Sequence, residues 1–210
     1  MTDLARALQE PWPNLRLQRE GVGLGMWFFL VSEMLFFGAL FCSYAVYRSL
    51  HPEAFRFAGA HTKIVYGSIN TAILLTSSFT MTVALRAATA QLQRLTLRYL
   101  GATAVLGVGF LICKGLEYRS DILEGLVPGP DFPLHPPATE IFWALYWIMT
   151  GIHAIHLTAG IGVVIVVMIL FGRRIIPVQG STMEGVAIYW HFVDCVWIFL
   201  YPLIYLVGRS

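Results

Sequence analysis

Five long apolar segments restrict this chain to one class of fold. Only 12% of the residues are Asp, Glu, Lys or Arg, whereas soluble domains carry roughly 25%. About 20 apolar residues suffice for a helix to cross the hydrocarbon core of a bilayer. Each segment reaches that length, although the third does so only with the charged residues at its ends, Arg98, Lys114 and Glu117, whose side chains can extend toward the membrane surface. The sequence therefore predicts an all-α integral membrane bundle of five transmembrane helices. The predicted spans are about 22–47, 64–86, 97–118, 140–171 and 184–207.

The links between these segments are short with one exception, which favours antiparallel neighbours within a single domain, residues 1–210. The exception, residues 119–139, holds five of the ten prolines and is expected to be a loop outside the membrane. The third segment is the most polar, because Lys114 and Glu117 lie close to its end. We expect these two side chains to bind each other or lipid head groups at the membrane surface.

Lysine and arginine are distributed unequally between the two ends of the predicted bundle. Eight of them lie in the N-terminal segment, the second link and the fourth link, which share one end of the bundle, and the opposite end carries six. The N-terminal segment also contains a predicted turn at residues 11–13. The positive-inside rule then predicts a cytoplasmic N-terminus and an external C-terminus. The net charge of +2 is too small and too dispersed to indicate nucleic-acid binding.

Glu33 is the only Asp, Glu, Lys, Arg or His between Gly21 and Tyr47. Its neighbours three and four positions away along a helix are aromatic or aliphatic, so its own helix offers no partner. A charge at the bilayer centre costs about 2.5–3.5 kcal/mol on insertion scales, which favours the protonated carboxyl group. Two interpretations stay open: Glu33 holds or relays a proton, or it makes one packing hydrogen bond with another helix.

Three histidines lie inside the predicted spans. His153 and His156 are one turn apart in the fourth span, beside small residues that permit close approach of another helix, and His191 lies in the fifth. A haem with two histidine ligands would take one from each of these helices. Hydrogen bonding between helices is the favoured interpretation for all three.

Other polar residues within the spans are interpreted as scaffold. His191 and Asp194 are three residues apart on one helix face, where a local ion pair or hydrogen bond is favoured over a proton relay. Trp190 lies beside them and is expected to pack between helices. Asn70 begins a polar stripe in the second span, and such groups usually form hydrogen bonds across helices.

The sequence lacks the patterns of enzymes that act alone. It contains no P-loop, no dinucleotide-binding fingerprint, no nucleophile elbow and no carboxylate-rich metal site. The three cysteines have no CxxC spacing, so neither a disulfide framework nor a zinc site is indicated. No catalytic or metal-binding residue is predicted in the chain.

One motif in each of the five successive spans resembles subunit III of the haem-copper oxidases. The motifs are Ser32–Phe37, Asn70-Thr71 with Leu74-Leu75, Glu117-Tyr118, Thr150-Gly151 with His153 and His156, and Trp190–Asp194 with Trp197 and Tyr201. The resemblance covers nearly all of residues 20–208. Long members of that family have seven helices, and this chain is similar to the shorter form that keeps the last five.

The resemblance implies a multi-pass subunit of the bacterial inner membrane that carries no redox centre. Haem and copper are expected on partner subunits, and the chain is expected to bind catalytic subunit I, subunit II and structural phospholipid. Such a subunit supports proton uptake and protects the catalytic subunit during turnover, and Glu33 matches the embedded glutamate of the family. The positions expected to serve structure or lipid contact are Asn70, Glu117, His153, His156, Trp190, His191 and Asp194. In the long members of the family a lipid-filled cleft separates the first two helices from the other five. In this chain another subunit would have to supply the missing wall of that cleft.

Several functions remain possible from the sequence. The glutamate in the first span and the Glu117-Tyr118 pair favour a cytochrome c oxidase, and a quinol oxidase or nitric oxide reductase subunit is the alternative. A bis-histidine membrane cytochrome b and a small transporter with Glu33 and Asp194 as proton carriers belong to other classes. Neither of these last two accounts for the full set of motifs.

Overall fold

The computed structural model describes residues 15–130, 132–134, 138–175 and 181–209, and within them all regular structure is helical. The turn predicted at residues 11–13 lies outside the described residues, as do two prolines of the long loop. Five described helices contain stretches long and apolar enough to cross a membrane, so the predicted number of spans is confirmed. They are α2 (Leu15–Leu50), α4 (Ile64–Thr89), α5 (Gln93–Leu123), α6 (Ala138–Gly172) and α7 (Ser181–Tyr201).

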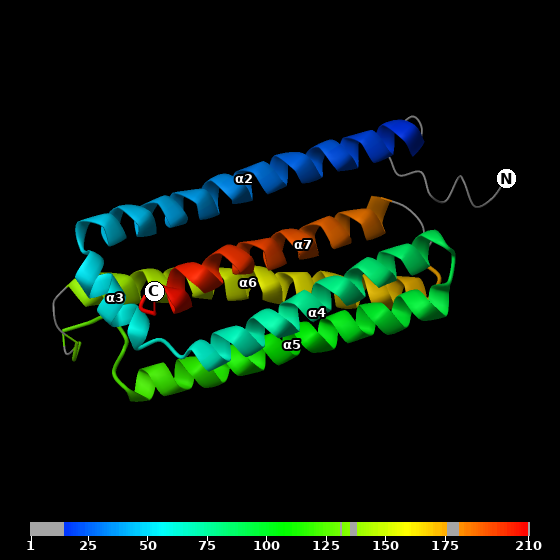
Figure 1. Cartoon of the computed structure of the whole chain (residues 1–210). Helices are drawn as coiled ribbons and strands as arrows, with labels where there is room; N and C mark the ends of the chain where they lie inside the picture. Colours follow the sequence, from blue (N-terminus) through cyan, green and yellow to red (C-terminus); the bar gives the residue numbers. More distant parts are fainter. Residues whose placement is uncertain (1–14, 131, 135–137, 176–180, 210) are drawn as a thin grey trace.

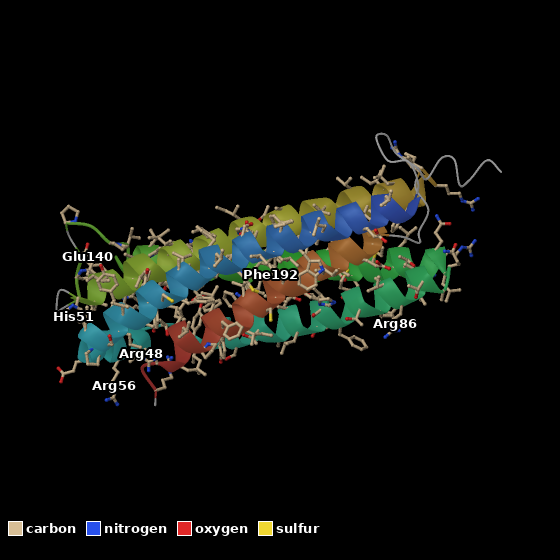
Figure 2. The ribbon with its side chains drawn as sticks, turned by 90° about the horizontal axis from the view of Figure 1, so that it is seen from above. Arg48, His51, Arg56, Arg86, Glu140 and Phe192 are labelled. Carbon is tan, nitrogen blue, oxygen red and sulfur yellow. The ribbon has the colours of Figure 1, made fainter. Side chains whose placement is uncertain are left out.

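Helices α4, α5, α6 and α7 pack together, and α2 lies along the side of α6 and α7 (Figure 1). In the most apolar 18-residue stretch of α2 only 11% of the residues are buried, compared with 44% in the corresponding stretch that begins in α7. The labelled charged residues Arg48, Arg56 and Glu140 lie at one end of the molecule, whereas Phe192 lies midway along it (Figure 2). This distribution is the one expected of helices that cross a membrane. Most of the α2 surface is thus free to contact lipid or another subunit.

Two short helical elements lie at the end of the bundle and are not evident from the sequence. The α3 helix (Pro52–Ala60) begins at a proline, and its Phe55 ring packs at 90° against Phe142 of α6, with centroids 5.5 Å apart. The π-helical turn η1 (Pro202–Leu206) follows α7 directly. Pro202 cannot donate the backbone hydrogen bond of a regular α-helix, which accounts for the change of winding at this position.

Helix α5 is longer than predicted, and this corrects the position of two charged residues. It continues to Leu123, so Lys114 and Glu117 lie inside the helix and not at its end. The helix stops at Gly125, whose φ is 72°, a conformation that glycine adopts without strain. The N–H of Leu126 bonds the carbonyl of Asp121 at 2.9 Å, as in a Schellman motif. The long loop therefore begins about five residues later than the sequence predicts.

Gly208 provides a test of the contact between η1 and α3. A Cβ atom at this position would lie 2.6 Å from the carbonyl oxygen of Arg56 and would also overlap the amide nitrogen of Ala60. Backbone atoms cannot rotate away, so Gly208→Ala should separate the chain end from α3 and cost about 1–3 kcal/mol. The measurement is the thermal unfolding midpoint of the protein in detergent.

Gly109→Ala is the matched control, because a Cβ atom at this position within α5 meets nothing within 4 Å. We expect it to be neutral or slightly stabilising, since alanine favours helix more than glycine does. Equal midpoints for the two variants would contradict the close packing at Gly208.

Candidate functional site

Glu33 lies in the middle part of α2 and contacts α6. Its Oε2 atom is 3.0 Å from Nε2 of His156, and the exposed fractions of the two side chains are 19% and 20%. The other ring nitrogen of His156, Nδ1, is 2.9 Å from the backbone carbonyl of Ile152, one turn earlier in α6. The imidazole ring is therefore held between a carbonyl group and a carboxyl group.

This geometry requires one proton between Glu33 and His156. A carbonyl oxygen only accepts hydrogen bonds, so Nδ1 of His156 carries a proton. In a neutral ring Nε2 is then an acceptor, and Glu33 donates as a carboxylic acid; otherwise an imidazolium ion donates to a carboxylate. Both arrangements place one proton in the Oε2···Nε2 hydrogen bond. Without that proton, two lone pairs would face each other at 3.0 Å.

The side chains around this pair are mostly apolar, although the Tyr189 hydroxyl donates to the backbone carbonyl of His156 at 2.9 Å. The ring of Phe37 packs edge-on against the imidazole of His156, with centroids 5.3 Å apart. A groove of about 230 Å³ opens between α2 and α7, and Met34, the residue that follows Glu33, lies in its wall. The lining residues are Met34, Phe37, Gly38, Phe41, Phe192, Cys195, Val196 and Phe199. Separated charges are costly in such a place, which favours the neutral form of the pair.

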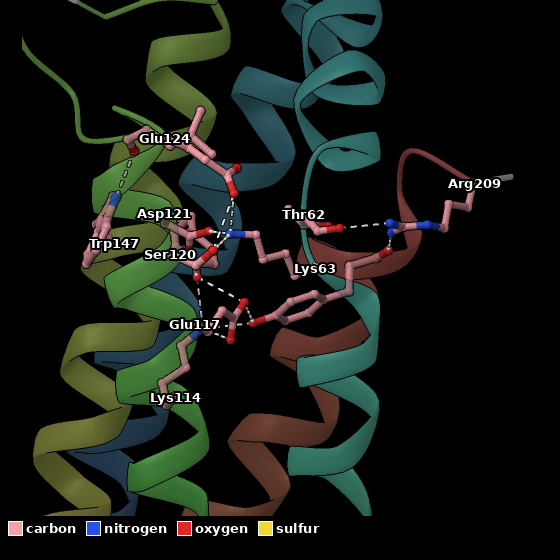
Figure 3. A network of polar contacts seen from close by, with 12 residues as sticks. Thr62, Lys63, Lys114, Glu117, Ser120, Asp121, Glu124, Trp147 and Arg209 are labelled. Carbon is pink, nitrogen blue, oxygen red and sulfur yellow. Dashed lines mark hydrogen bonds and ion pairs between the residues drawn. The ribbon is translucent and has the colours of Figure 1, made fainter.

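A second group of polar side chains, here called the lysine cluster, lies toward the end of the bundle that carries α3 (Figure 3). It consists of Lys63, Lys114, Glu117, Asp121, Glu124, Tyr146 and Tyr205. Nζ of Lys114 donates to Oε2 of Glu117 at 3.0 Å, to the Tyr146 hydroxyl at 3.1 Å and to the Tyr205 hydroxyl at 2.8 Å. All three ammonium protons of Lys114 are thus bound.

The two tyrosines donate their own protons to carboxylates of the lysine cluster. The Tyr146 hydroxyl is 2.7 Å from Oδ2 of Asp121 and 3.1 Å from Oε1 of Glu117. The Tyr205 hydroxyl is 2.7 Å from Oε1 of Glu117. Each phenol therefore accepts from a cation and donates to an anion, an arrangement that binds α5, α6 and η1 together.

Lys63 joins this buried group to the surface. Its Nζ atom is 3.2 Å from Oδ1 of Asp121 and 2.8 Å from Oε1 of the half-exposed Glu124. Burial by itself would lower the pKa of Lys63, but the hydrogen bonds to Glu124 and Asp121 outweigh it and the pKa is raised. The hydrogen bond from Lys63 also lowers the pKa of Glu124. Both groups are therefore charged at neutral pH.

The location predicted for Lys114 and Glu117 is wrong, although their predicted contact with each other is confirmed. Their side chains are 2% and 1% exposed, so neither reaches the lipid head groups. The two tyrosines offer the hydrogen bonds that water and lipid would otherwise supply. This removes the reason for the long lysine side chain to extend toward the membrane surface.

The predicted pair between His191 and Asp194 is also wrong. Nδ1 of His191 is 2.7 Å from Oγ of Ser78 on α4, and Nε2 is 3.4 Å from Oγ1 of Thr82. Asp194 is 4% exposed, and neither of its carboxyl oxygens has a hydrogen bond within the described part of the chain. The facing helix thus offers His191 a better partner than its own helix does.

His153 has a different environment from the other two histidines. Its ring lies between Phe110 and Trp197, at centroid distances of 5.5 and 5.1 Å, and neither ring nitrogen has a hydrogen bond among the described residues. The described residues contain no group of three or more His, Cys, Asp or Glu side chains that could hold a metal ion. No observation favours the bis-histidine haem.

The polar stripe of α4, which the sequence places at Asn70, Thr71, Thr76, Ser77 and Ser78, follows the prediction in part. Trp190 of α7 is buried and donates its indole N–H to Oγ of Ser77 at 3.1 Å, and Trp197 donates to Oγ1 of Thr71 at 3.0 Å. Asn70 is fully buried, and its amide has no hydrogen bond within the described ranges. The hydroxyl of Thr76 bonds the carbonyl of Ala72 on its own helix. The predicted bonds between helices are therefore made by Thr71, Ser77 and Ser78 and not by Asn70.

Comparison with known proteins identifies the family. Residues 14–209 match the family model described as cytochrome c oxidase subunit III. The chain belongs to this family. The match spans all five long helices, and it confirms the resemblance to haem-copper oxidase subunit III that the motifs indicate.

Relatives of this subunit III serve oxidases with different names. Cytochrome bo(3) ubiquinol oxidase subunit 3 of Pseudomonas aeruginosa is 30% identical over 186 residues, which cover 88% of this chain and 84% of that protein. Cytochrome c oxidase subunit 3 of Thermostichus vulcanus is 34% identical over 192 residues, covering 89% and 87%. Quinol oxidase subunit 3 of Bacillus spizizenii is 31% identical over 195 residues, covering 88% and 86%.

Sequence reasoning alone misses the partner of Glu33 and most of the lysine cluster. Glu33 and His156 both lie near the middle of long apolar segments, and this equal depth is a signal that would pair them. Asp121 falls in a predicted loop, so nothing in the sequence directs it into the bundle. Tyr146 and Tyr205 give no signal either, because tyrosines at the ends of spans are usually interfacial.

The contribution of the lysine cluster to stability can be tested at Lys114 and Glu117. Lys114→Met leaves Glu117 as a buried charge without its cation, which should cost about 3–5 kcal/mol. Lys114→Met combined with Glu117→Gln removes both charges and should recover most of that loss, because neutral replacements of a buried ion pair are well tolerated. The thermal unfolding midpoint in detergent measures both effects. Equal destabilisation by the single and the double variant would show that the ion pair is not the source of the stability.

Proposed function

We propose that this chain is a non-redox subunit of a proton-pumping cytochrome c oxidase, in which its Glu33–His156 pair holds a proton that supports proton uptake by catalytic subunit I. The supporting observation is the proton that the geometry requires between Oε2 of Glu33 and Nε2 of His156. The proton belongs to Glu33 in the neutral pair, because an ion pair among these aromatic side chains would have to be desolvated. Haem and copper belong to partner subunits I and II in this proposal.

The lipid and membrane assignments extend the same proposal. The groove between α2 and α7 is lined by aromatic and aliphatic side chains, which fit a phospholipid acyl chain. The exposed face of α2 is where the catalytic subunit or further lipid would bind, since little of this helix is buried. The excess of Lys and Arg on the N-terminal side supports a cytoplasmic N-terminus and an external C-terminus in a bacterial inner membrane.

Glu33→Gln tests the proton-holding role. The glutamine amide still donates a hydrogen bond to Nε2 of His156, so we expect assembly with the oxidase to be unchanged. An amide holds no transferable proton, so proton uptake should slow, or activity should be lost several-fold faster during turnover. The measurements are proton uptake by the purified oxidase in liposomes and the decay of oxygen consumption with time.

Ser32→Ala is the matched control, because Ser32 is exposed on the same helix and its hydroxyl bonds the backbone carbonyl of Phe29, one turn earlier in that helix. It should behave as the parent does. A Glu33→Gln subunit that no longer assembles would assign Glu33 to packing. A variant that assembles and keeps the parent's uptake and lifetime would contradict the proton-holding role.

The electron donor is tested by the partners that copurify with this subunit. The relative from Thermostichus vulcanus favours cytochrome c, whereas the Pseudomonas and Bacillus proteins are named for quinol oxidases. We expect a tagged chain to copurify with a subunit that carries a binuclear copper domain, in a complex that oxidises reduced cytochrome c. A complex that oxidises only quinol, without that copper domain, would replace the proposed donor with the alternative.

A further inference from the structure

The buried part of the lysine cluster contains one more acid than base. Lys114 contributes one positive charge, and Glu117 and Asp121 contribute one negative charge each. The Asp121 side chain is only 2% exposed, so an uncompensated charge at this position has little access to water. Lys63, which reaches Asp121 from the link before α4, supplies the positive charge that balances this buried part, and the half-exposed Glu124 adds a further negative charge on the outer side of Lys63.

The contacts of Asp121 show which oxygen depends on Lys63. Oδ2 accepts the proton of Tyr146, whereas Oδ1 faces Nζ of Lys63 at 3.2 Å. Lys63 is 21% exposed and is shared with Ser120 and with Glu124, which is 51% exposed. Unlike Lys114, whose three protons are bound by buried partners, Lys63 is partly exposed and has in Glu124 a partner that is itself half exposed. It is the cation of the cluster with access to water.

We propose that the lysine cluster is a proton-binding site, in which a proton and the Lys63 ammonium group compete for Oδ1 of Asp121. When Lys63 turns outward, a proton from water at the membrane surface binds Oδ1, and the buried group stays neutral. When Lys63 returns, the proton goes back to water. The site shares no residue with the Glu33–His156 pair, and it stands whether or not the proposed role of that pair is correct.

The groups that surround Asp121 support this exchange. The ionisable groups around Asp121 are Lys63 before α4, Lys114, Glu117 and Tyr118 of α5, Tyr146 of α6 and Tyr205 of η1, while Glu124 and its neighbour His61 lie on the outer side of Lys63. Tyr146 and Tyr205 donate to carboxylates, the Tyr118 hydroxyl bonds the hydroxyl of Thr150, and Lys114 and Glu117 neutralise each other. Lys63 is therefore the group whose movement changes the charge next to Asp121.

Lys63→Gln in the intact oxidase tests the competition. Without the cation, folded Asp121 holds a proton that the released, unfolded chain does not hold at neutral pH. The folded state then binds one more proton, so its stability falls as the pH rises. The ratio of folded to unfolded chain should fall by about tenfold for each pH unit of increase, which is the limit for one bound proton. An infrared band of a protonated carboxylic acid should appear at the same time.

Two further variants complete the test. Lys63→Gln with Asp121→Asn should lose both the pH slope and the infrared band, because no titrating oxygen is left. Glu124→Gln should show neither the loss of stability with rising pH near neutrality nor the infrared band, since it leaves Lys63 next to Asp121. If Lys63→Gln does not accumulate at neutral pH, the double variant should restore it by removing the unpaired charge.

The proposal would be overturned by a Lys63→Gln oxidase that loses stability equally at all pH values, which is the result for a purely structural contact. A double variant that keeps the infrared band, or that fails to restore accumulation, would also overturn it.

Discussion

Hydrocarbon offers no hydrogen-bond partners, so the ionisable groups of the two polar sites in this bundle depend on partners within the protein. Glu33 of α2 meets this constraint with His156 of α6, and Lys114 meets it with two tyrosines and a carboxylate. The two solutions differ in their charge. The Glu33–His156 hydrogen bond forms only with a proton between the two side chains. The buried charges around Lys114 form an ionic network that needs the additional cation Lys63.

This difference follows the way the helices pack. Helix α2 is mostly exposed and touches the bundle along one side, so the Glu33–His156 hydrogen bond lies where lipid or a partner subunit can reach it. The lysine cluster lies where α5, α6 and η1 meet, and its inner residues are almost fully buried. In the proposed function, a proton bound at Glu33 is therefore placed for exchange with a neighbouring subunit. In the proposed exchange at the lysine cluster, Lys63 provides the connection to the surroundings.

The sequence predicts the parts of this structure that depend on hydrophobicity and fails where partners come from distant segments. The five spans follow from their apolar residues, which any packing arrangement would need. The α3 helix is too short to give such a signal and is held by the contact of Phe55 with Phe142. His191 is paired incorrectly because spacing along one helix identifies Asp194, whereas the bundle supplies Ser78 from α4. Lys114 is misplaced because two tyrosines, far apart in the sequence, replace water around it.

Carbodiimide labelling of the intact oxidase tests most directly whether Glu33 holds a proton inside the membrane. An apolar carbodiimide reacts with a neutral carboxyl group in an apolar place. The account predicts label at neutral pH on the peptide that contains Glu33, and none on Glu117, which is buried as an ion. Label on Glu117 with none on Glu33 would contradict it.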